Sequence, residues 1–277
     1  MIEDLTAEEY ERFRLLLERI SGIKLGAGKE YLVRSRLRRL LEKESFGSFS
    51  ELMVIMKLKR SLQEQVIDAM TTNETLWFRD DHPYQIFREK LLPEMATLNR
   101  PLRIWSAACS TGQEPYSLSM EIEEYKKRFP NRLMAGERIV ATDISPSSLA
   151  IAKQGVYQQL AISRGMNDAY LTSYFAKDEA GRWRIQQNIK SRVEFSVQNL
   201  QQSYASLGKF DIIFCRNVLI YFSADLKQDI LTRMHASLNP GGYLMLGASE
   251  IMNNISAYYE MVQCHPGLVY KAKVVKR

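Results

Sequence analysis

Apolar residues recur at helical spacing through about the first 70 residues, and little of this stretch alternates as a strand would. Three segments carry a helix-start signal of the capping-box kind: Thr6-Ala7-Glu8-Glu9, Ser48-Phe49-Ser50-Glu51 and Ser61-Leu62-Gln63-Glu64. Apolar stripes follow the first and the last of them: Phe13, Leu16, Leu17 and Ile20, then Leu62, Val66, Ile67 and Met70. The pattern predicts a small all-helical domain here.

Beyond about residue 100, short apolar runs alternate with helical patterns, which indicates an α/β domain with a largely parallel sheet. A helix over 84–96 is expected to lead into the first strand. The expected strands are 102–105, 139–144, 193–197, 210–215 and 243–247. Ser223 is the expected N-cap of a helix over 224–238 that Asn239-Pro240-Gly241-Gly242 ends. The runs 258–262 and 268–274 suit a closing antiparallel pair.

The α/β alternation is interrupted between residues 156 and 192. Runs at 174–177 and 182–185 flank the turn Asp178-Glu179-Ala180-Gly181 and predict an antiparallel hairpin. Arg182, Trp183 and Arg184 would suit pairing with a peptide along a free edge. The alternative is a simple extension of the sheet edge.

The second expected helix, over residues 29–43, carries an unusual share of the basic charge. Its apolar face consists of Val33, Leu37, Leu40 and Leu41. Lys29, Arg36 and Arg39 fall together on another face, with Arg34 and Arg38 beside them. This stripe is either an ordinary solvated surface or a docking surface for an acidic helix or for phosphates.

Small residues follow the first expected strand, in the stretch Ser106-Ala107-Ala108-Cys109-Ser110-Thr111-Gly112. Small residues allow a ligand to approach the backbone, and the helix that begins near Pro115 presents free N–H groups. The turn lacks the Gly-Lys-Ser/Thr of a phosphate-binding loop, while Glu114 could neutralise a cation. An ordinary strand-to-helix turn remains the alternative.

Two later strands also end in polar residues. The strand at 139–144 ends near Asp143, where a carboxylate typically accepts from ribose hydroxyls, although a turn aspartate would look the same. Ser145-Pro146 then begins a helix. The apolar strand at 210–215 is followed by Arg216 and Asn217, at the edge where open α/β sheets bind ligands.

The stretch from Met70 to Asp80 joins the two expected domains and mixes Thr, Asn and Arg with Trp and Phe. Polar donors beside aromatic rings suit a loop that covers a small-molecule ligand. An ordinary interdomain connection is the alternative.

Composition narrows the function classes without choosing one. The chain of 277 residues is 45% hydrophobic and 25% charged, as in globular proteins, and has no long uncharged apolar run or signal-peptide pattern. The net charge of +6 favours an acidic partner such as nucleic acid, an anionic membrane surface or an acidic protein face. Three widely spaced cysteines and three unclustered histidines give no metal-ligand spacing and suit a reducing compartment.

Taken together, the motifs resemble those of class I S-adenosylmethionine-dependent methyltransferases, and more closely the CheR family of chemotaxis receptor methyltransferases, which are protein-glutamate O-methyltransferases. The resemblance covers essentially the whole chain. Four segments carry it: Thr71-Thr72-Asn73-Glu74-Thr75 with Phe78-Arg79, Trp105 to Ser117, Thr142-Asp143-Ile144, and Phe214-Cys215-Arg216-Asn217-Val218-Leu219-Ile220-Tyr221-Phe222.

The resemblance implies a Rossmann-like methyltransferase domain over 79–277, a helical N-terminal receptor-docking domain with its linker over 1–78, and an inserted β-subdomain over 156–192. It implies S-adenosylmethionine as cofactor, with no metal. The residues that it assigns to the cofactor are Asn73, Thr75, Arg79, Glu114, Asp143, Asn199, Leu200, Arg216 and Asn217. It places Arg79 and Tyr221 beside the transferred methyl group as catalytic residues that orient the incoming glutamate.

The resemblance further implies that Lys29, Arg36 and Arg39 lie along the acidic methylation helices of a chemoreceptor cytoplasmic bundle. Glu42 interrupts the expected basic face. We expect a cytoplasmic monomer that is recruited to membrane receptor arrays without entering the membrane and without binding nucleic acid. A methyltransferase of RNA is the runner-up, although Arg216-Asn217-Val218-Leu219 stands where an exocyclic-amine enzyme would carry Asn/Asp-Pro-Pro-Tyr/Phe. A catalytically silent scaffold is the third possibility.

Overall fold

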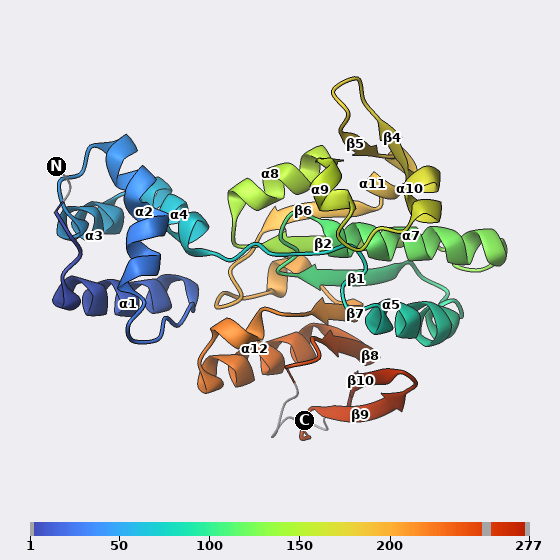
Figure 1. Cartoon of the computed structure of the whole chain (residues 1–277). Coiled ribbons are helices and arrows are strands. Elements are labelled where there is room, and N and C mark those ends of the chain that lie inside the picture. Colours follow the sequence, from blue (N-terminus) through green and yellow to red (C-terminus); the bar gives the residue numbers. More distant parts are fainter. Residues whose placement is uncertain (1–2, 251–255, 275–277) are drawn as a thin grey trace.

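The computed structural model describes residues 3–250 and 256–274. The N-terminal part of the chain is an all-helical domain. Its helices are α1 (Ala7–Ser21), α2 (Glu30–Glu44), α3 (Phe49–Leu58) and α4 (Arg60–Met70) (Figure 1). The predicted stripes meet in one apolar core, in which Phe13, Leu37 and Val66 are fully buried. Thr6 and Glu9 form the predicted capping box, and Ser48 caps α3.

One start signal in this domain was wrong. Helix α4 begins at Arg60, and its N-cap is Lys59, which makes no side-chain capping bond. Ser61 therefore lies inside the first turn of the helix. The apolar stripe behind it, from Leu62 to Met70, still packs into the core, because the stripe depends on residue spacing rather than on the cap.

The second domain is built on a seven-stranded sheet of order β6-β2-β1-β7-β8-β10-β9. The strands are β1 (Leu102–Ala107), β2 (Glu137–Asp143), β6 (Val193–Val197), β7 (Phe210–Cys215), β8 (Leu238–Leu246), β9 (Tyr259–Cys264) and β10 (Gly267–Ala272). The first five strands of that order pair in parallel, while β10 runs antiparallel to both β8 and β9. The mixed α/β fold predicted from the sequence is confirmed.

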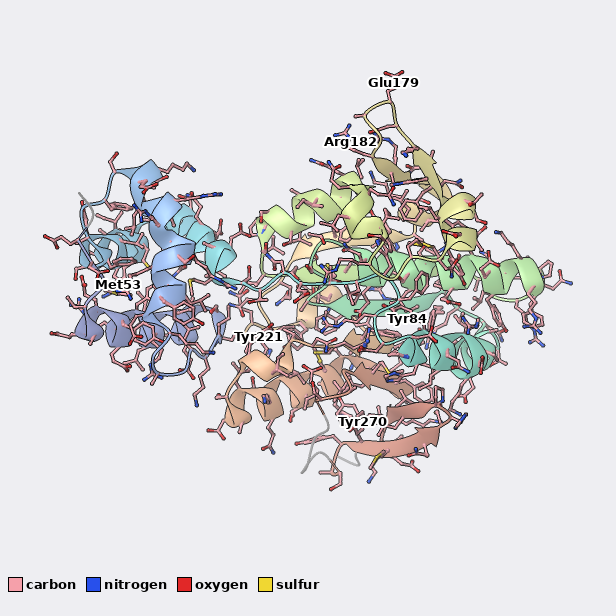
Figure 2. The ribbon with its side chains drawn as sticks, in the orientation of Figure 1. Met53, Tyr84, Glu179, Arg182, Tyr221 and Tyr270 are labelled. Atoms are coloured by element: carbon pink, nitrogen blue, oxygen red, sulfur yellow. The ribbon has the colours of Figure 1, made fainter. Side chains whose placement is uncertain are left out.

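Both faces of this sheet are covered by helices, so alternate residues of each strand enter different apolar cores. Ile212 and Phe214 of β7 pack on the side of α7 (Gln113–Arg128), whereas Ile213 and Cys215 pack on the side of α12 (Ala224–Ser237). The remaining regular helices of this layer are α5 (His82–Ile86), α6 (Leu92–Met95) and α8 (Pro146–Gln154), and short 3-10 turns lie at η2 (Ala205–Leu207) and η3 (Leu219–Tyr221). Figure 2 shows Tyr84 inside this domain and Tyr221 at its junction with the helical domain.

Two element boundaries differ from expectation. The helix predicted over 84–96 is divided into α5, a π-helical turn η1 (Phe87–Leu91) and α6, where Pro93 has no N–H to continue the regular ladder. Strand β8 begins at Leu238, so Asn239–Gly242 is a bulge within the strand and not a stop before it. Gly242 fits there because a Cβ would lie 2.9 Å from the Asp211 carbonyl oxygen.

The predicted hairpin is confirmed and belongs to a separate small sheet of order β3-β5-β4. Its strands are β3 (Val156–Tyr157), β4 (Phe175–Lys177) and β5 (Trp183–Ile185), accompanied by α9 (Gln159–Ile162), α10 (Asp168–Tyr174) and α11 (Gln187–Lys190). The hairpin projects from the top of the domain in Figure 1. Across residues 3–250 and 256–274, no helix combines the length and the hydropathy needed to cross a membrane.

Candidate functional site

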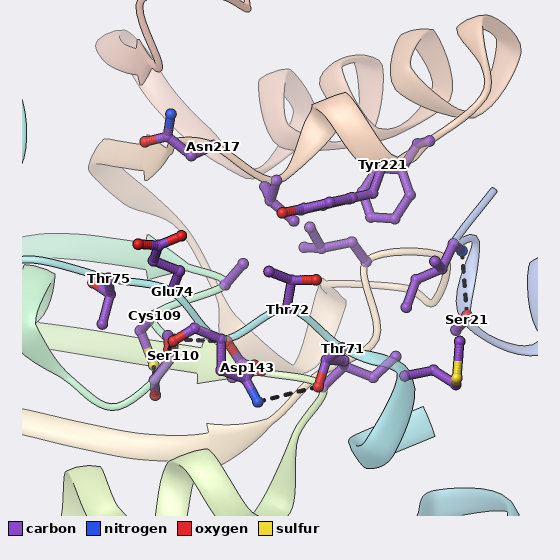
Figure 3. Close-up of a pocket in the computed structure, with 18 of the residues that line it drawn as sticks. Ser21, Thr71, Thr72, Glu74, Thr75, Cys109, Ser110, Asp143, Asn217 and Tyr221 are labelled. Atoms are coloured by element: carbon purple, nitrogen blue, oxygen red, sulfur yellow. Dashed lines mark hydrogen bonds between the residues drawn. The ribbon is translucent and has the colours of Figure 1, made fainter. Parts of the chain in front are cut away.

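A cavity of about 220 Å³ lies where the two domains meet. Its walls are the linker after α4, the loop between β1 and α7, the carboxyl ends of β2, β6 and β7, and the inner side of the helical domain. Figure 3 shows Tyr221 and Asn217 on one side of it and Thr71, Thr72 and Asp143 on the other. The predicted cofactor and catalytic residues all line it: Asn73, Thr75, Arg79, Glu114, Asp143, Asn199, Leu200, Arg216, Asn217 and Tyr221.

The loop between β1 and α7 has an unusual backbone. Ala108, Ser110 and Gly112 all have positive φ, at 58°, 50° and 95°. Left-handed conformations in non-glycine residues cost free energy and persist where the surroundings enforce them. At Gly112 a Cβ would also lie 2.9 Å from the Ala152 Cβ, so packing as well as backbone conformation requires glycine at this position.

Asp143 fixes that loop to the next strand. One carboxylate oxygen accepts from the Ser110 N–H at 2.7 Å, and the other accepts from the Ser145 N–H at 2.9 Å. Burial raises the pKa of Asp143, and the N–H donors oppose this shift. Each oxygen has a second lone pair, so the group retains acceptor capacity toward the cavity that it lines.

Glu114 and Arg216 form a buried ion pair beneath the cavity. Arg216 Nη1 lies 3.2 Å from Glu114 Oε2, and Glu114 Oε1 accepts from Ser106 Oγ at 2.8 Å. Arg216 Nη2 donates to Asp80 at 2.8 Å and to the Arg79 carbonyl oxygen at 2.6 Å. Burial raises the pKa of Glu114, which Arg216 partly offsets. The cation that Glu114 neutralises in the structure is therefore Arg216, a residue of the same chain.

Arg216 also retains an unused donor. Its side chain is 1% exposed, and its Nε has no hydrogen-bond partner among the described residues. Buried donors are normally paired, and exceptions occur at functional sites. The guanidinium lies 5.7 Å from the centre of the Tyr84 ring, which supports it from the apolar core.

Glu250 does not line the cavity but supports one of its walls, and sequence reasoning missed it. Its carboxylate accepts from the backbone N–H groups of Asn217, Leu219 and Gly247 at 2.6, 2.7 and 2.9 Å. It thereby holds the turn after β7, where Asn217 has a φ of 59°. A Cβ on Gly247 would lie 2.6 Å from Glu250 Oε2, so the glycine before it leaves room for the contact. Gly247 and Glu250 directly after the last parallel strand were the available signal.

The linker is bonded to the second domain along its length. The Asn73 carbonyl oxygen accepts from Ser110 Oγ at 2.9 Å, and the Phe78 N–H donates to Ser117 Oγ at 3.2 Å. Trp77 is buried against Tyr157 and Phe175 of the small sheet, with ring centroids 5.0 and 5.3 Å away. The stretch is thus an integral wall of the cavity, and the interpretation of it as a mere connection is not supported.

Arg79 is less constrained than Arg216. The hydrogen bonding of its side chain within the described residues consists of one long contact of 3.4 Å, from Nη1 to the Glu74 carbonyl oxygen. Its guanidinium therefore keeps donors for a ligand in the cavity that it lines.

The helical domain closes the cavity through a few contacts. Asn199 Nδ2 donates to the Ile20 carbonyl oxygen at 2.9 Å, and the Lys24 N–H donates to the Tyr221 carbonyl oxygen at 2.9 Å. Asp68 near the end of α4 accepts from Ser147 Oγ at 2.9 Å and from Ser145 Oγ. Asn199 is therefore engaged with the helical domain, while Leu200 is buried beside it.

The three predicted docking residues are placed differently from one another. Lys29 and Arg39 are exposed, and Lys29 reaches the cavity rim. Arg36 turns inward and donates to the linker, at 2.9 Å to the Thr71 carbonyl oxygen and 3.0 Å to Thr72 Oγ1. The docking role of these residues stays a prediction, and for Arg36 the structure shows another engagement.

Two family models match the chain. "CheR methyltransferase, all-alpha domain" matches residues 8–71, and "CheR methyltransferase, SAM binding domain" matches residues 73–268. The chain belongs to the CheR methyltransferase family. The match confirms the resemblance drawn from the motifs, and S-adenosylmethionine is the cofactor of the second domain.

Curated relatives of the same family cover nearly the whole chain. A chemotaxis protein methyltransferase 1 of Pseudomonas aeruginosa is 54% identical over 96% of this chain and 98% of its own length. A chemotaxis protein methyltransferase 1 of Vibrio cholerae is 50% identical over 97% of this chain and 98% of its own. A solved TehB-like S-adenosylmethionine-dependent methyltransferase of Corynebacterium glutamicum aligns at 17% identity and a TM-score of 0.40, covering 68% of this chain and 88% of its own. The CheR relatives show that this chain is a methyltransferase of chemotaxis.

The residues present suit this cofactor. It carries a ribose diol, an aromatic base with apolar faces and an amino-acid tail, and the cavity of this CheR chain offers Asp143, the buried side chain of Leu200 and a mixture of charged groups. Among the described residues, no group of three or more His, Cys, Asp or Glu side chains has a metal-binding arrangement.

Proposed function

We propose that this protein transfers the methyl group of S-adenosylmethionine to glutamate side-chain carboxylates of chemoreceptors and forms glutamate methyl esters. The observation that carries the proposal is Arg79, which lines the cavity with donors to spare, whereas Arg216 beside it is bonded to Glu114 and Asp80. A guanidinium with free donors can bind a carboxylate in two-pronged geometry. This match supports a carboxylate as the methyl acceptor.

The charges around the cavity support an anionic acceptor. Its lining includes the cations Lys24, Lys29, Arg36, Arg79 and Arg216 against the anions Glu74, Glu114 and Asp143. A site with excess positive charge and apolar walls attracts negatively charged groups. A glutamate carboxylate meets this requirement more directly than a neutral amine would.

Methyl transfer to a carboxylate requires no general base from the protein. A glutamate carboxylate is ionised at neutral pH, with an ordinary pKa of about 4.3, so its oxygen is already a nucleophile. The lining residues described include no histidine, and burial raises the pKa of the Cys109 thiol well above its ordinary value. Cys109 and Cys215 are both buried packing residues and not nucleophiles.

Orientation is then the main contribution of the protein. The cofactor supplies an electrophilic methyl group on a sulfonium. In the proposed roles, Arg79 holds the acceptor carboxylate, and the Tyr221 hydroxyl fixes its second oxygen. Alignment of two reactants can lower a barrier by several kcal/mol, up to ~7–11 in favourable cases. Replacement of the hydration of both charges by fixed protein groups would assist.

Recognition of the receptor is assigned to the exposed part of α2. Of the three predicted docking residues, Lys29 and Arg39 are exposed and would face acidic methylation helices of the receptor bundle. On this proposal the protein acts as a monomer in the cytoplasm, at the membrane-embedded receptor arrays, and has no nucleic-acid substrate.

The first experiment is transfer of labelled methyl from S-adenosylmethionine to a cytoplasmic receptor fragment, with total RNA as a parallel substrate. Base-labile label on receptor glutamates is the expected result, because carboxyl methyl esters hydrolyse in base. Label on RNA would reassign the basic helix to nucleic-acid recognition. Cofactor binding without transfer to either substrate would leave two readings, the wrong receptor fragment or a silent scaffold.

Arg79→Ala and Tyr221→Phe test the orienting roles. Each should lower kcat at least tenfold and by a clearly larger factor than it weakens cofactor binding, because both variants lose an acceptor contact, although Arg79 is also assigned a cofactor contact. Tyr31→Phe, at a side chain that is 65% exposed, is the matched control and should leave both unchanged. Equal losses of turnover and cofactor affinity would contradict the orienting role.

A further inference from the structure

We propose that Arg36 is a positioning residue of the cofactor pocket, and that its principal effect is on cofactor affinity rather than on receptor docking. The proposal rests on the S-adenosylmethionine site and holds whatever the methyl acceptor is. Arg36 lies on α2, more than thirty residues along the chain from the groups that it holds.

The guanidinium of Arg36 binds the end of α4 and the first residues of the linker. Nη1 donates to the carbonyl oxygens of Met70 and Thr71 at 2.5 and 2.9 Å. Nη2 donates to Thr72 Oγ1 at 3.0 Å. Three consecutive residues are therefore tied to one side chain.

The Arg36 guanidinium lies at the negatively polarised C-terminal end of helix α4. The last carbonyl groups of a helix have no partner within it and carry the negative end of its dipole, so a cation is stabilising there. Met70 is the last residue of α4, and Thr71 is its C-cap. Arg36 thus completes the hydrogen bonding of a helix end that opens directly into the cavity wall.

The neighbouring arginines of α2 behave differently. Arg34 is paired with Asp4 at 3.0 Å, and Arg38 is paired with Glu42 at 3.0 Å, both at exposed positions. Arg36 has no such carboxylate within ion-pair distance in the described ranges 3–250 and 256–274; its contacts are with linker oxygens. On this one helix, Arg36 alone of the three bonds inward.

The contact continues from Arg36 to the cofactor loop. Thr71 Oγ1 accepts from Asn73 Nδ2 at 3.1 Å, and the Asn73 carbonyl oxygen accepts from Ser110 Oγ at 2.9 Å. The Ser110 N–H in turn is held by Asp143. Arg36, Thr71, Asn73, Ser110 and Asp143 are therefore linked in sequence, each residue hydrogen-bonded to the next, and the series ends at the carboxylate predicted to bind ribose.

The test measures binding of S-adenosylhomocysteine by calorimetry, with no receptor present. Arg36→Ala should weaken binding at least tenfold, and Arg36→Lys should recover part of the loss, because an ammonium can reach some of these oxygens but not all. Arg39→Ala is the matched control on the same helix and should change affinity less than twofold. Unchanged affinity in Arg36→Ala would overturn the proposal and return Arg36 to the docking surface.

A second readout requires no ligand. In the cofactor-free protein, hydrogen exchange at the amides of residues 72–79 should be faster in Arg36→Ala than in Arg39→Ala, while the exchange of the β1 and β7 amides stays the same. Equal exchange at the linker in both variants would contradict the positioning role.

A double-mutant cycle guards against a general loss of folding. Thr72→Val removes one acceptor of Arg36 and should weaken cofactor binding two- to fivefold in the wild-type background. In the Arg36→Ala background the same change should have a smaller effect, because the contact is already absent. Strict additivity of the two changes would show that the contact does not support the pocket.

Discussion

The two ends of strands β1 and β7 use buried charge in opposite ways. At their amino ends, Asp211 accepts from both terminal nitrogens of Arg100, from the Arg103 N–H and from Asn239 Nδ2, all within 2.9 Å. At their carboxyl ends, Glu114 accepts from Ser106 Oγ and, at 3.2 Å, from Arg216. One carboxylate is saturated with donors, and the other is not.

The pKa values follow this difference. Hydrogen bonds from Arg100, Arg103 and Asn239 outweigh burial and lower the pKa of Asp211. At Glu114, burial dominates and raises the pKa. The end away from the cavity is organised for stability, whereas the cavity end contains an unpaired buried donor, Arg216 Nε, and non-glycine residues in left-handed conformations.

The largest effect is expected at the cavity end, from Arg216→Met. The change leaves Glu114 and Asp80 without their cation, and loss of one partner from a buried pair costs about 3–5 kcal/mol. Urea unfolding measures the free energy. Arg60→Met, in a pair whose side chains are 88% and 50% exposed, is the control and should cost less than about 0.5 kcal/mol. If Arg216→Met lowered the free energy of unfolding by less than about 1 kcal/mol, the ion pairs of Arg216 would have to be accessible to water.

An intermediate effect is expected at the opposite end, from Asp211→Asn. An amide can accept from only some of the four donors, so the loss should be about 2 kcal/mol at pH 7. Because the folded-state pKa is lowered from 3.8, this stabilisation is present above that value and disappears as the pH falls through the folded-state pKa. Urea unfolding at several pH values should show the variant and the wild type converging below pH 3.8. A constant difference would contradict the assignment.

The smallest effect is expected from Glu114→Gln, which should cost no more than about 1 kcal/mol at pH 7, because the amide can retain the Ser106 bond while Arg216 keeps its contacts with Asp80 and the Arg79 carbonyl oxygen. Its pH dependence should have the opposite sign. A folded-state pKa raised above 4.5 gives stability that is present below 4.5 and is lost as the pH rises through the folded-state pKa. The wild type should therefore lose its advantage over the variant toward neutral pH. The same trend in Asp211→Asn and Glu114→Gln would erase the contrast between the two ends.

Sequence patterns predicted the strands and the helical domain because these depend on local spacing. The alternation at 193–197, the buried run at 210–215 and the Ser145 and Ser223 caps all appear in the structure as expected. The bulged start of β8 was not predicted, because Asn239-Pro240-Gly241-Gly242 signals a turn locally and is drawn into the sheet by pairing.

The cavity was predicted less completely. Strand ends identified Asp143, Glu114 and Arg216, since parallel strands end at one edge. Glu250 could not be assigned from spacing, because its three backbone donors come from two separate turns. Nor did the charge stripe on α2 distinguish Arg36 from Arg39, because direction toward the linker depends on how α2 packs against α4.

The position of the linker bears on modularity. The two matched family models meet at residues 71 and 73, while residues 70–76 all line the cavity. An exchange of helical domains between relatives at that junction would replace one wall of the active site together with the docking helix. In evolutionary terms, the two domains and their junction should be inherited together, because the cavity needs all three. A chimera that preserves the fold of each domain can still lose the cavity between them.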